Sequence, residues 1–296
     1  MRMDITEQLL AYSSMTEQAL KVYLSDEKIP ADFREVMGYS LFAGGKRLRP
    51  ALVMGAAQLC GGNSEDVLPF ACGMEMIHTY SLIHDDLPAI DDDDYRRGRL
   101  TSHKAFDEAK AILAGDGSLS FAFEIMLEAT LTGKQPLHFL CATRDIAHAA
   151  GVHGMVAGQW VDVRSEGQQL DMETLEYIHD NKTAAMIVGA LKAGAHAAGA
   201  DEAAVTALAR YGRELGLTFQ IIDDILDVVG DQKELGKPVG SDAANQKQTY
   251  VTRLGVEGAF AQAVKHTEEA STALKVFGEK AVFLDQLAQY LLKRRK

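Results

Sequence analysis

The chain has 296 residues, of which 47% are hydrophobic, and its formal net charge is −12 at neutral pH. This acidic balance argues against nucleic acid as the main partner, because binding a phosphate backbone needs a basic footprint. No run of residues approaches the roughly 20 consecutive apolar residues of a membrane span. Residues 1–7 lead directly into a polar helical pattern without the apolar core of a signal peptide. We therefore expect a cytoplasmic protein without a membrane span.

Composition and turn signals predict an all-α chain. Only six prolines occur, alanine, leucine and methionine are frequent, and runs of β-branched residues are few. Glycine-containing turns are expected to divide the chain into helices of about 15 to 25 residues. These turns lie at residues 44–45, 61–63, 133, 230–231 and 236–240. No internal repeat or linker is visible, so the simplest architecture is one large helical bundle that forms a single domain over residues 1–296.

A first cluster of carboxylates lies in residues 81–94, at the expected end of a helix. Six aspartates occur between Asp85 and Asp94. Pro88 is expected to end or distort the helix and to bring Asp91 back towards Asp85. Carboxylates at a helix C-terminus are electrostatically unfavourable, so a positive group must offset them. The alternative is an acidic surface loop.

A second cluster of carboxylates lies on a helix predicted over residues 212–229. Apolar residues up to Val229 flank one narrow stripe, which contains Gln220, Asp223 and Asp227. A helix that is apolar on most sides is buried, so this stripe should face an internal cavity, and the alternative is a solvated charged face. Burying charge is costly without a counter-ion. Two such clusters therefore favour a hard divalent cation, Mg²⁺, that carries a polyphosphate.

Basic residues beside glycine or beside the aspartates form a third feature. They lie in residues 44–50, 96–99, 182–183 and 236–238. In a net-acidic protein such loops suit a phosphate ligand, because glycine lets the backbone approach closely and arginine donates paired hydrogen bonds. The basic tail, residues 293–296, is instead expected to be a solvated helix end.

In these segments the chain resembles the short-chain trans-prenyl diphosphate synthases, and within that family the bacterial farnesyl diphosphate synthases. The likeness follows the family's order through residues 44–50, 84–98, 114–116, 155–159, 182–183, 219–227 and 235–242. The resemblance implies an all-α isoprenoid synthase fold, a single large bundle around a central cavity, and a homodimer.

The resemblance also implies roles for individual residues. Two metal-binding motifs would hold Mg²⁺, three ions in all with Mn²⁺ as an alternative, on the diphosphate of dimethylallyl or geranyl diphosphate. The first motif is Asp85, Asp86 and Asp91, and the second is Asp223, Asp224 and Asp227. The other allylic-site positions are Arg96, Lys182, Thr183, Gln220 and Lys237, and those for isopentenyl diphosphate are Lys46, Arg49, His78 and Arg97. The six aspartates, Lys182 and Lys237 are expected to serve catalysis.

The implied reaction condenses isopentenyl diphosphate head to tail with dimethylallyl or geranyl diphosphate to give (2E,6E)-farnesyl diphosphate and pyrophosphate. Ionisation of the allylic C–O bond leaves growing negative charge on the diphosphate, which Mg²⁺ and cationic side chains stabilise. Tyr80 precedes Asp85 by five residues, about 7 Å along a helix axis, although on ideal helix geometry it points away from Asp85. An aromatic residue at this position resembles the farnesyl-forming pattern of the family, and the resemblance therefore implies that Tyr80 forms the floor that limits product length. Ser81 is a second candidate for this position, and the alternative is that Tyr80 is ordinary core.

Other functions remain open at this point. A terpene cyclase of the same fold is disfavoured by the second aspartate motif and by the separate cations for isopentenyl diphosphate. A geranylgeranyl or other-length trans-prenyl diphosphate synthase would differ in pocket depth. A ferritin-like di-metal protein is suggested by Glu-x-x-His at residues 75–78 and 176–179, although no partnering glutamate stands out before Glu75. A non-catalytic cation-binding protein would need no basic loops.

Overall fold

The computed structural model describes residues 4–229 and 248–294, and these residues confirm the all-α prediction. The helices are α1 (Ile5–Leu24), α2 (Ala31–Leu41), α3 (Leu48–Leu59), α4 (Leu68–Asp85), α5 (Ser102–Ala105), α6 (Glu108–Thr132), α7 (Pro136–Ala150), α8 (Met155–Arg164), α9 (Met172–Ile178), α10 (Ala185–Ala197), α11 (Glu202–Val229), α14 (Tyr250–Ala273) and α15 (Val282–Leu292). A π-helical turn, η1 (His179–Ala184), joins α9 to α10, and a 3₁₀ segment, η2 (Leu274–Ala281), joins α14 to α15. Within the described ranges the strands are β1 (Tyr95–Arg96) and β2 (Arg99–Leu100), which form one short antiparallel hairpin.

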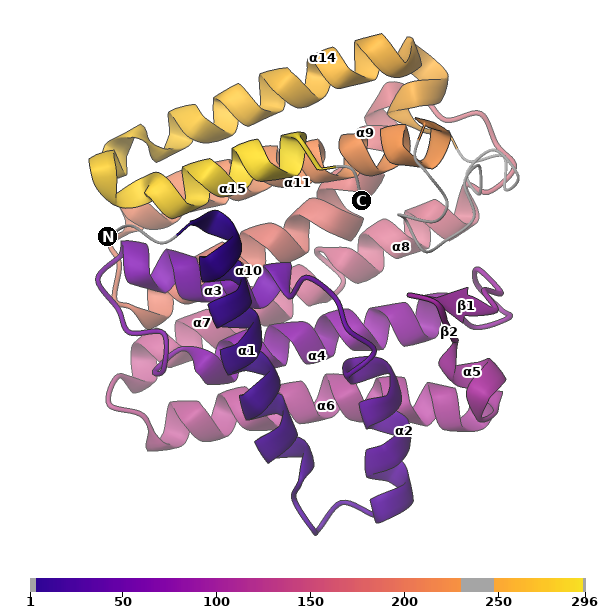
Figure 1. Ribbon diagram of the computed structural model, residues 1–296, viewed down its shortest axis with the longest axis vertical. Helices are drawn as coiled ribbons and strands as arrows, with labels where there is room; N and C mark the ends of the chain where they lie inside the picture. The colour runs from indigo at the N-terminus through magenta and orange to yellow at the C-terminus, as the bar shows by residue number, and fades with distance from the viewer. Residues whose placement is uncertain (1–3, 230–247, 295–296) are drawn as a thin grey trace.

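The long helices lie side by side as a bundle. Figure 1 shows α14 at the top of this stack and α6 at the bottom, with α1 and α2 crossing in front of the others. Helix α10 packs against α3, α7 and α11, while α4 packs against α6 and α11 against α14. Helix α10 is therefore an internal helix, which agrees with its row of fully buried alanine and leucine side chains.

The apolar stripes of the two motif helices are buried as predicted. In α4 the side chains of Phe70, Met74 and Ile77 are completely inaccessible to solvent. In α11 a second core cluster includes Ile221 and Ile225 together with residues of α9 and α14. The prediction was wrong at the end of α11, where Val228 and Val229 are exposed. No helix among the described residues is long and apolar enough to cross a membrane.

Candidate active site

The segment after α4 folds back on itself and brings Asp91 beside Asp85. The backbone N–H of Asp91 donates to the carbonyl oxygen of Asp85 at 2.9 Å, and the N–H of Asp92 donates to that of Leu87 at 3.1 Å. Helical hydrogen bonding stops just before Pro88, which lacks an N–H and whose ring restricts the preceding residue. The structure thus confirms the expected return of Asp91.

Arg96 is the positive group that compensates Asp86. Its Nε donates to Asp86 Oδ1 at 2.7 Å and its Nη2 lies 2.5 Å from the same oxygen. Asp86 is buried, whereas the side chains of Asp93 and Asp94 are 52% and 62% exposed. The alternative of an acidic surface loop therefore holds for the end of the cluster and not for its start. The hairpin β1–β2 provides this arginine directly after the aspartates.

Asp85 lies in an environment that disfavours a bare carboxylate. Burial raises the pKa of Asp85 to about 6, the neighbouring Lys182 opposes this shift, and Asp91 adds to it. The carboxylate of Asp85 is therefore disfavoured chiefly because it is buried, and a further cation bound beside it would stabilise the charged form.

Lys182 and Thr183 lie on the π-helical turn η1, which is held between two helices by close backbone contacts. A Cβ atom at Gly158 of α8 would lie 2.2 Å from the backbone nitrogen of Lys182, and one at Gly216 of α11 would lie 2.5 Å from the Cβ of Ala184. Both positions therefore need glycine. Single π-turns within helices are frequent at functional sites, and this one directs Lys182 towards the acidic residues.

The ammonium group of Lys182 lies between carboxylates. Its Nζ is 2.6 Å from Asp162 Oδ2 on α8. Burial alone would lower the pKa of Lys182, but Asp162 and Asp85 outweigh it and raise that pKa. Lys182 is therefore positively charged at neutral pH. Sequence analysis did not select Asp162, because a single aspartate on an amphipathic helix carries no distinguishing pattern.

The second aspartate motif is connected to η1 through Gln220. Thr183 Oγ1 donates to Gln220 Oε1 at 3.0 Å, and Gln220 Nε2 donates to Asp224 Oδ1 at 3.0 Å. Asp224 Oδ2 accepts from the backbone N–H of Tyr250 at 3.1 Å. Asp224 and Asp227 are buried, whereas the Asp223 side chain is 39% exposed. Asp223 is thus the most accessible carboxylate of this motif.

The residues predicted to bind isopentenyl diphosphate, Lys46, Arg49, His78 and Arg97, line a cavity of about 400 Å³, which we call the basic cavity. Arg47, Glu75, Phe219 and Arg294 also line it. Arg97 donates to the carbonyl oxygen of Gly44. The buried Nε of Arg49 has no hydrogen-bond partner in the described structure. Burial, reinforced by Arg49 and Arg97, lowers the pKa of His78 well below its ordinary value, so this imidazole is neutral. An anion in this cavity would supply the acceptors that these donors need.

Arg294 corrects the expectation that the basic tail is solvated. Its side chain is 5% exposed, and its Nη2 donates to the carbonyl oxygen of Phe219 at 2.8 Å and to Asp223 Oδ1 at 3.2 Å. The guanidinium also stacks on the Phe219 ring at 4.0 Å. Sequence reasoning missed it because the run of four cations obscured the pattern. The buried leucines Leu284, Leu287 and Leu291 of α15 continue at helical spacing to position 294.

Arg47 differs from its neighbours in the basic loop because it is completely buried. Its Nη1 lies 2.7 Å from Glu75 Oε1, its Nη2 lies 3.2 Å from Glu17 Oε1, and Nη2 also donates to the carbonyl oxygen of Leu41 at 2.7 Å. Glu75 stands one helical turn before His78 in α4. This ion pair fixes the loop that carries Lys46 and Arg49, and it commits Glu75 to a structural contact.

Loss of Glu75 should therefore destabilise the protein strongly. Glu75→Leu is expected to lower the free energy of unfolding by roughly 3–5 kcal/mol, because the buried guanidinium of Arg47 loses its partner. Urea unfolding followed by circular dichroism measures this change. Glu17→Gln, at the half-exposed partner, should cost much less, and the double variant Arg47→Met/Glu75→Leu should recover most of the loss. Equal losses for Glu17→Gln and Glu75→Leu would contradict the assignment.

Three neighbouring cavities connect these groups. Lys182 and Thr183 line both the cavity of Gln220, Asp223 and Asp224 and a larger one of about 430 Å³ that contains Asp85, Tyr80 and Ser81. Arg49 and His78 are shared between this larger cavity and the basic cavity. Asp86 and Arg96 instead line a small cavity with Arg97, and Asp91 lines none of these cavities. The cavities thus bring Asp85, Asp223 and Asp224 to one continuous site with Lys182, Arg49 and His78. Asp227 lies one turn beyond it, and Lys237 falls outside the described residues.

The Glu-x-x-His motifs do not form a di-metal centre. Glu75 is paired with Arg47, and the buried ring of His179 stacks on Tyr250. In the described parts of the chain, the only three metal-ligating side chains whose ligand atoms lie within 4.8 Å of one another are Glu214, His266 and Glu269. The aspartate motifs form no such group of three, as expected for Mg²⁺, which is usually bound through one or two carboxylates plus water and phosphate oxygens.

Comparison with known proteins gives consistent matches. The sequence profile described as polyprenyl synthetase matches residues 30–281. Farnesyl diphosphate synthase of Geobacillus stearothermophilus is 44% identical over 274 residues, which cover 93% of this chain and 92% of the relative. The chloroplastic geranylgeranyl pyrophosphate synthase of Capsicum annuum is 43% identical over 292 residues, which cover 98% and 78% respectively. A putative farnesyl-diphosphate synthase from Marinomonas sp. MED121 superposes with a TM-score of 0.85 at 36% identity, over 99% of this chain and all of that structure.

Proposed function

The chain belongs to the polyprenyl synthetase family, and on this basis we propose that it is a farnesyl diphosphate synthase that makes the (2E,6E) product. Trans-prenyl diphosphate synthase activity, and hence prenyl transfer, follows from the family; the fifteen-carbon product is our proposal. One observation supports it above the others. Three cavities that share lining residues form one site. Its acidic end contains Asp223 and Asp224, its basic end contains Lys46, Arg49 and Arg97, and the cavity between them contains Asp85 and Tyr80. Related proteins named geranylgeranyl diphosphate synthases make a twenty-carbon product the alternative.

We assign the acidic end to the allylic diphosphate. The metal ligands available there are carboxylate oxygens, the hard ligands that Mg²⁺ prefers. The ions would be held by the two aspartate motifs, which are Asp85, Asp86 and Asp91 and then Asp223, Asp224 and Asp227. When bound, Mg²⁺ or Mn²⁺, three ions in our proposal, would stabilise charge on the departing diphosphate. Lys182 supplies a fixed positive charge beside the same diphosphate. Arg96 would contact the allylic diphosphate if its guanidinium gave up the contact with Asp86. The hydrogen bond between Thr183 and Gln220 orients both of these side chains. Lys237, outside the described residues, is assigned here by resemblance.

We assign the basic end to isopentenyl diphosphate. Lys46, Arg49 and Arg97 can pair with its diphosphate, and neutral His78 can donate a hydrogen bond. The alkene would then point towards the larger cavity, where the allylic carbon lies. Phe219, stacked under Arg294, lines the basic cavity and would help to keep water out from that side of the site. No nucleophilic side chain is needed, because the alkene attacks and the proton can leave to the released pyrophosphate.

Product analysis tests this function directly. The protein is incubated with isopentenyl diphosphate, each allylic starter and Mg²⁺, and the products are separated by chain length. We expect farnesyl diphosphate as the main product, no turnover after treatment with EDTA, and recovery on addition of Mg²⁺. Condensation at the original rate in EDTA would refute the role of the aspartate motifs, and a twenty-carbon main product would favour the alternative.

Arg97→Ala is expected to raise the KM for isopentenyl diphosphate by about tenfold or more, because one charge-assisted contact to phosphate is lost. The KM for geranyl diphosphate should change little. Steady-state kinetics with each substrate varied in turn measures both values. Arg99→Ala is the matched control, since Arg99 lies on the same hairpin but stacks on Tyr39. A KM increase confined to geranyl diphosphate would reverse the assignment of the two ends.

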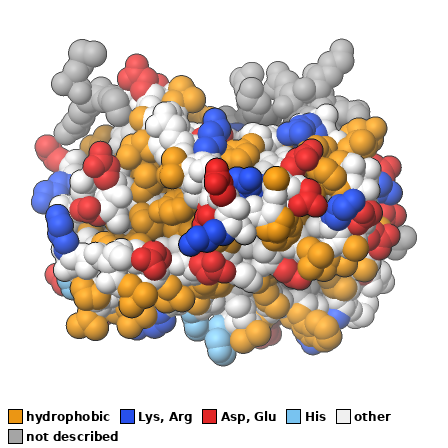
Figure 2. Space-filling view, turned by 90° about the horizontal axis from the view of Figure 1, so that it is seen from below, with side chains coloured by type: hydrophobic (Ala, Val, Ile, Leu, Met, Phe, Trp, Pro, Cys, Tyr) orange, Lys and Arg blue, Asp and Glu red, His pale blue; other side chains and the backbone are white. Residues whose placement is uncertain are grey.

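We further propose that the protein is a cytoplasmic homodimer with one synthase domain over residues 1–296. Helix α6 carries four large apolar side chains that are exposed in the isolated chain, Ile112, Leu113, Leu127 and Leu131. Figure 2, which views the molecule from the side of α6, shows hydrophobic patches on this face. Burying such a face against a second copy removes apolar surface from water. Sedimentation velocity tests this assembly.

A further inference from the structure

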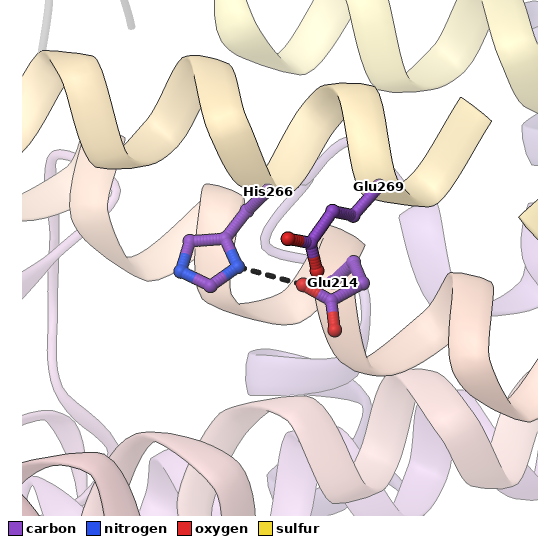
Figure 3. Close-up of side chains that lie close together, drawn as sticks. All are labelled: Glu214, His266 and Glu269. Carbon is purple, nitrogen blue, oxygen red and sulfur yellow. Dashed lines mark hydrogen bonds and ion pairs between the residues drawn. The ribbon is translucent and has the colours of Figure 1, made fainter. Parts of the chain in front are cut away.

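A group of metal-ligating side chains lies away from the site described above. Glu214 belongs to α11, nine residues before Asp223, a distance of about 13 Å along the helix axis. His266 and Glu269 are three residues apart on α14 and therefore lie on one face of that helix. Figure 3 shows the three side chains directed towards one another from the two packed helices. One ligand atom of each lies within 4.8 Å of the other two.

The two carboxylates in this group differ in their partners. Glu214 is buried, and its Oε2 lies 2.6 Å from His266 Nδ1. Arg213 Nη1 lies only within 3.5 Å of the other Glu214 oxygen, while its Nη2 is paired with Asp180 at 2.8 Å. The partly buried carboxylate of Glu269 has no hydrogen bond or ion pair with any described residue, and it faces Glu214 (Figure 3). Burial alone would raise the pKa of Glu214, but His266 and Arg213 outweigh it and lower that pKa. Glu269 has no comparable partner, so a cation shared between the two carboxylates would offset its negative charge.

We propose that Glu214, His266 and Glu269 form a binding site for a divalent transition-metal ion of the Zn²⁺ class. One imidazole nitrogen and two carboxylate oxygens suit Zn²⁺, with water as a fourth ligand, whereas Mg²⁺ prefers oxygen ligands alone. Carboxylate and histidine ligands three residues apart on one helix, completed by a glutamate from its neighbour, are typical of metal sites in helical bundles. Binding requires Nδ1 of His266 to release its proton and the ligand atoms to draw closer, to about 2 Å from the ion.

The proposed metal site lies between helices α11 and α14, so a bound ion would affect how these helices are held together. Helices α11 and α14 are joined here by the His266–Glu214 contact, and α11 carries the second aspartate motif further along the same helix. An ion bound to both helices would clamp α11 onto α14 and stabilise the folded chain, because it binds only where both helices are in place. The proposal does not depend on the substrates of the enzyme.

Zinc binding to metal-free, full-length protein tests the proposal. Isothermal titration with Zn²⁺ is compared for the wild type, His266→Gln and Glu269→Gln, with Glu268→Gln as control. The control removes one charge from the adjacent, exposed residue of α14. We expect the wild type and Glu268→Gln to bind one more Zn²⁺ per chain than His266→Gln and Glu269→Gln, or to bind it at least about tenfold more tightly. Zinc held by the aspartate motifs is common to all four proteins and cancels in the comparison.

Cobalt spectra and thermal unfolding separate this result from misfolding. Co²⁺ bound to the wild type should give a visible absorption band that is altered in His266→Gln, while the circular dichroism of the metal-free proteins stays the same. Zn²⁺ should raise the unfolding temperature of the wild type and of Glu268→Gln by more than it raises that of His266→Gln and Glu269→Gln. Equal zinc binding by all four proteins, equal loss in Glu268→Gln, or a loss confined to His266→Gln would each overturn the three-ligand site and leave a hydrogen-bonded ion cluster.

Discussion

Asp85→Asn is expected to lower kcat by a factor on the order of 10²–10³ or more, with a similar loss for Asp223→Asn. Each change removes a negative oxygen from the place where we assign the ions on the leaving diphosphate, and loss of one such electrostatic contact commonly has this effect. Asp85 ends α4 beside Lys182, and Asp223 is the accessible carboxylate of the second motif. Single-turnover measurements with geranyl diphosphate and isopentenyl diphosphate report the chemical step.

Asp94→Asn is the matched control for this prediction. Asp94 belongs to the same acidic segment, but its side chain is exposed and lies 2.8 Å from Lys104 on the outside of the molecule. Its replacement should change kcat only slightly. Comparable losses at Asp85 and Asp94 would mean that the whole segment acts through its overall charge, and the assignment of individual ligands would be wrong.

Stability provides a second readout that distinguishes a lost function from a lost fold. The pKa of Asp85 is raised to about 6, so its contribution to stability is present at low pH and is lost as the pH rises through about 6. Asparagine carries no charge at any of these pH values. Without divalent cations at pH 8, Asp85→Asn should therefore be more stable than the wild type, by at most roughly 3 kcal/mol at about 1.4 kcal/mol per pKa unit. This advantage should shrink towards pH 4.

The sequence was informative where periodicity and burial coincide. Asp223 could be placed at an internal site because the residues around it in α11 are apolar on most sides, and Pro88 was sufficient to predict that Asp91 returns to Asp85. Both predictions depend only on residues that are close to one another in the sequence, within a few helical turns. The resemblance then supplied the roles of individual residues, which periodicity alone does not carry.

Features that depend on contacts between distant segments could not be predicted in this way. The π-turn at Lys182 depends on Gly158 and Gly216, which come from two other helices. Arg47 and Arg49 are two residues apart in one basic loop, yet Arg47 is paired with Glu75 while the buried Nε of Arg49 has no hydrogen-bond partner in the described structure. Only the fold tells these arginines apart. Arg294 was missed for a different reason. The apolar stripe of α15 that leads to it is visible in the sequence, but the four consecutive cations at residues 293–296 are typical of a solvated helix end.

Tyr80→Ala is expected to shift the main product from fifteen carbons to twenty or more. Tyr80 lines the same cavity of about 430 Å³ as Asp85, on the preceding part of α4. Its half-buried ring packs edge-on against His84, with ring centroids 5.3 Å apart. Each added isoprene unit must extend from the acidic end into this cavity, so a ring about 7 Å deeper along the helix can stop the chain. Tyr80→Met should act in the same direction, because the flexible methionine side chain can move aside. Its effect should be weaker than that of Tyr80→Ala, because methionine still fills part of the cavity.

Ser81 makes this prediction specific, because it lines the same cavity and its hydroxyl donates to the carbonyl oxygen of His78. If the growing tail passes Ser81 before it reaches Tyr80, Ser81→Phe should shorten the product to ten carbons, whereas Tyr80→Ala lengthens it. Chromatography of the dephosphorylated alcohols measures both effects, with circular dichroism to verify folding. Longer products from a Ser81→Ala variant, together with an unchanged fifteen-carbon product from folded Tyr80→Ala, would place the floor at residue 81 and make Tyr80 ordinary core. The opposite pattern would assign the chain-length limit to the tyrosine ring, since the two side chains leave neighbouring positions of α4 in different directions and meet the path of the tail at different points.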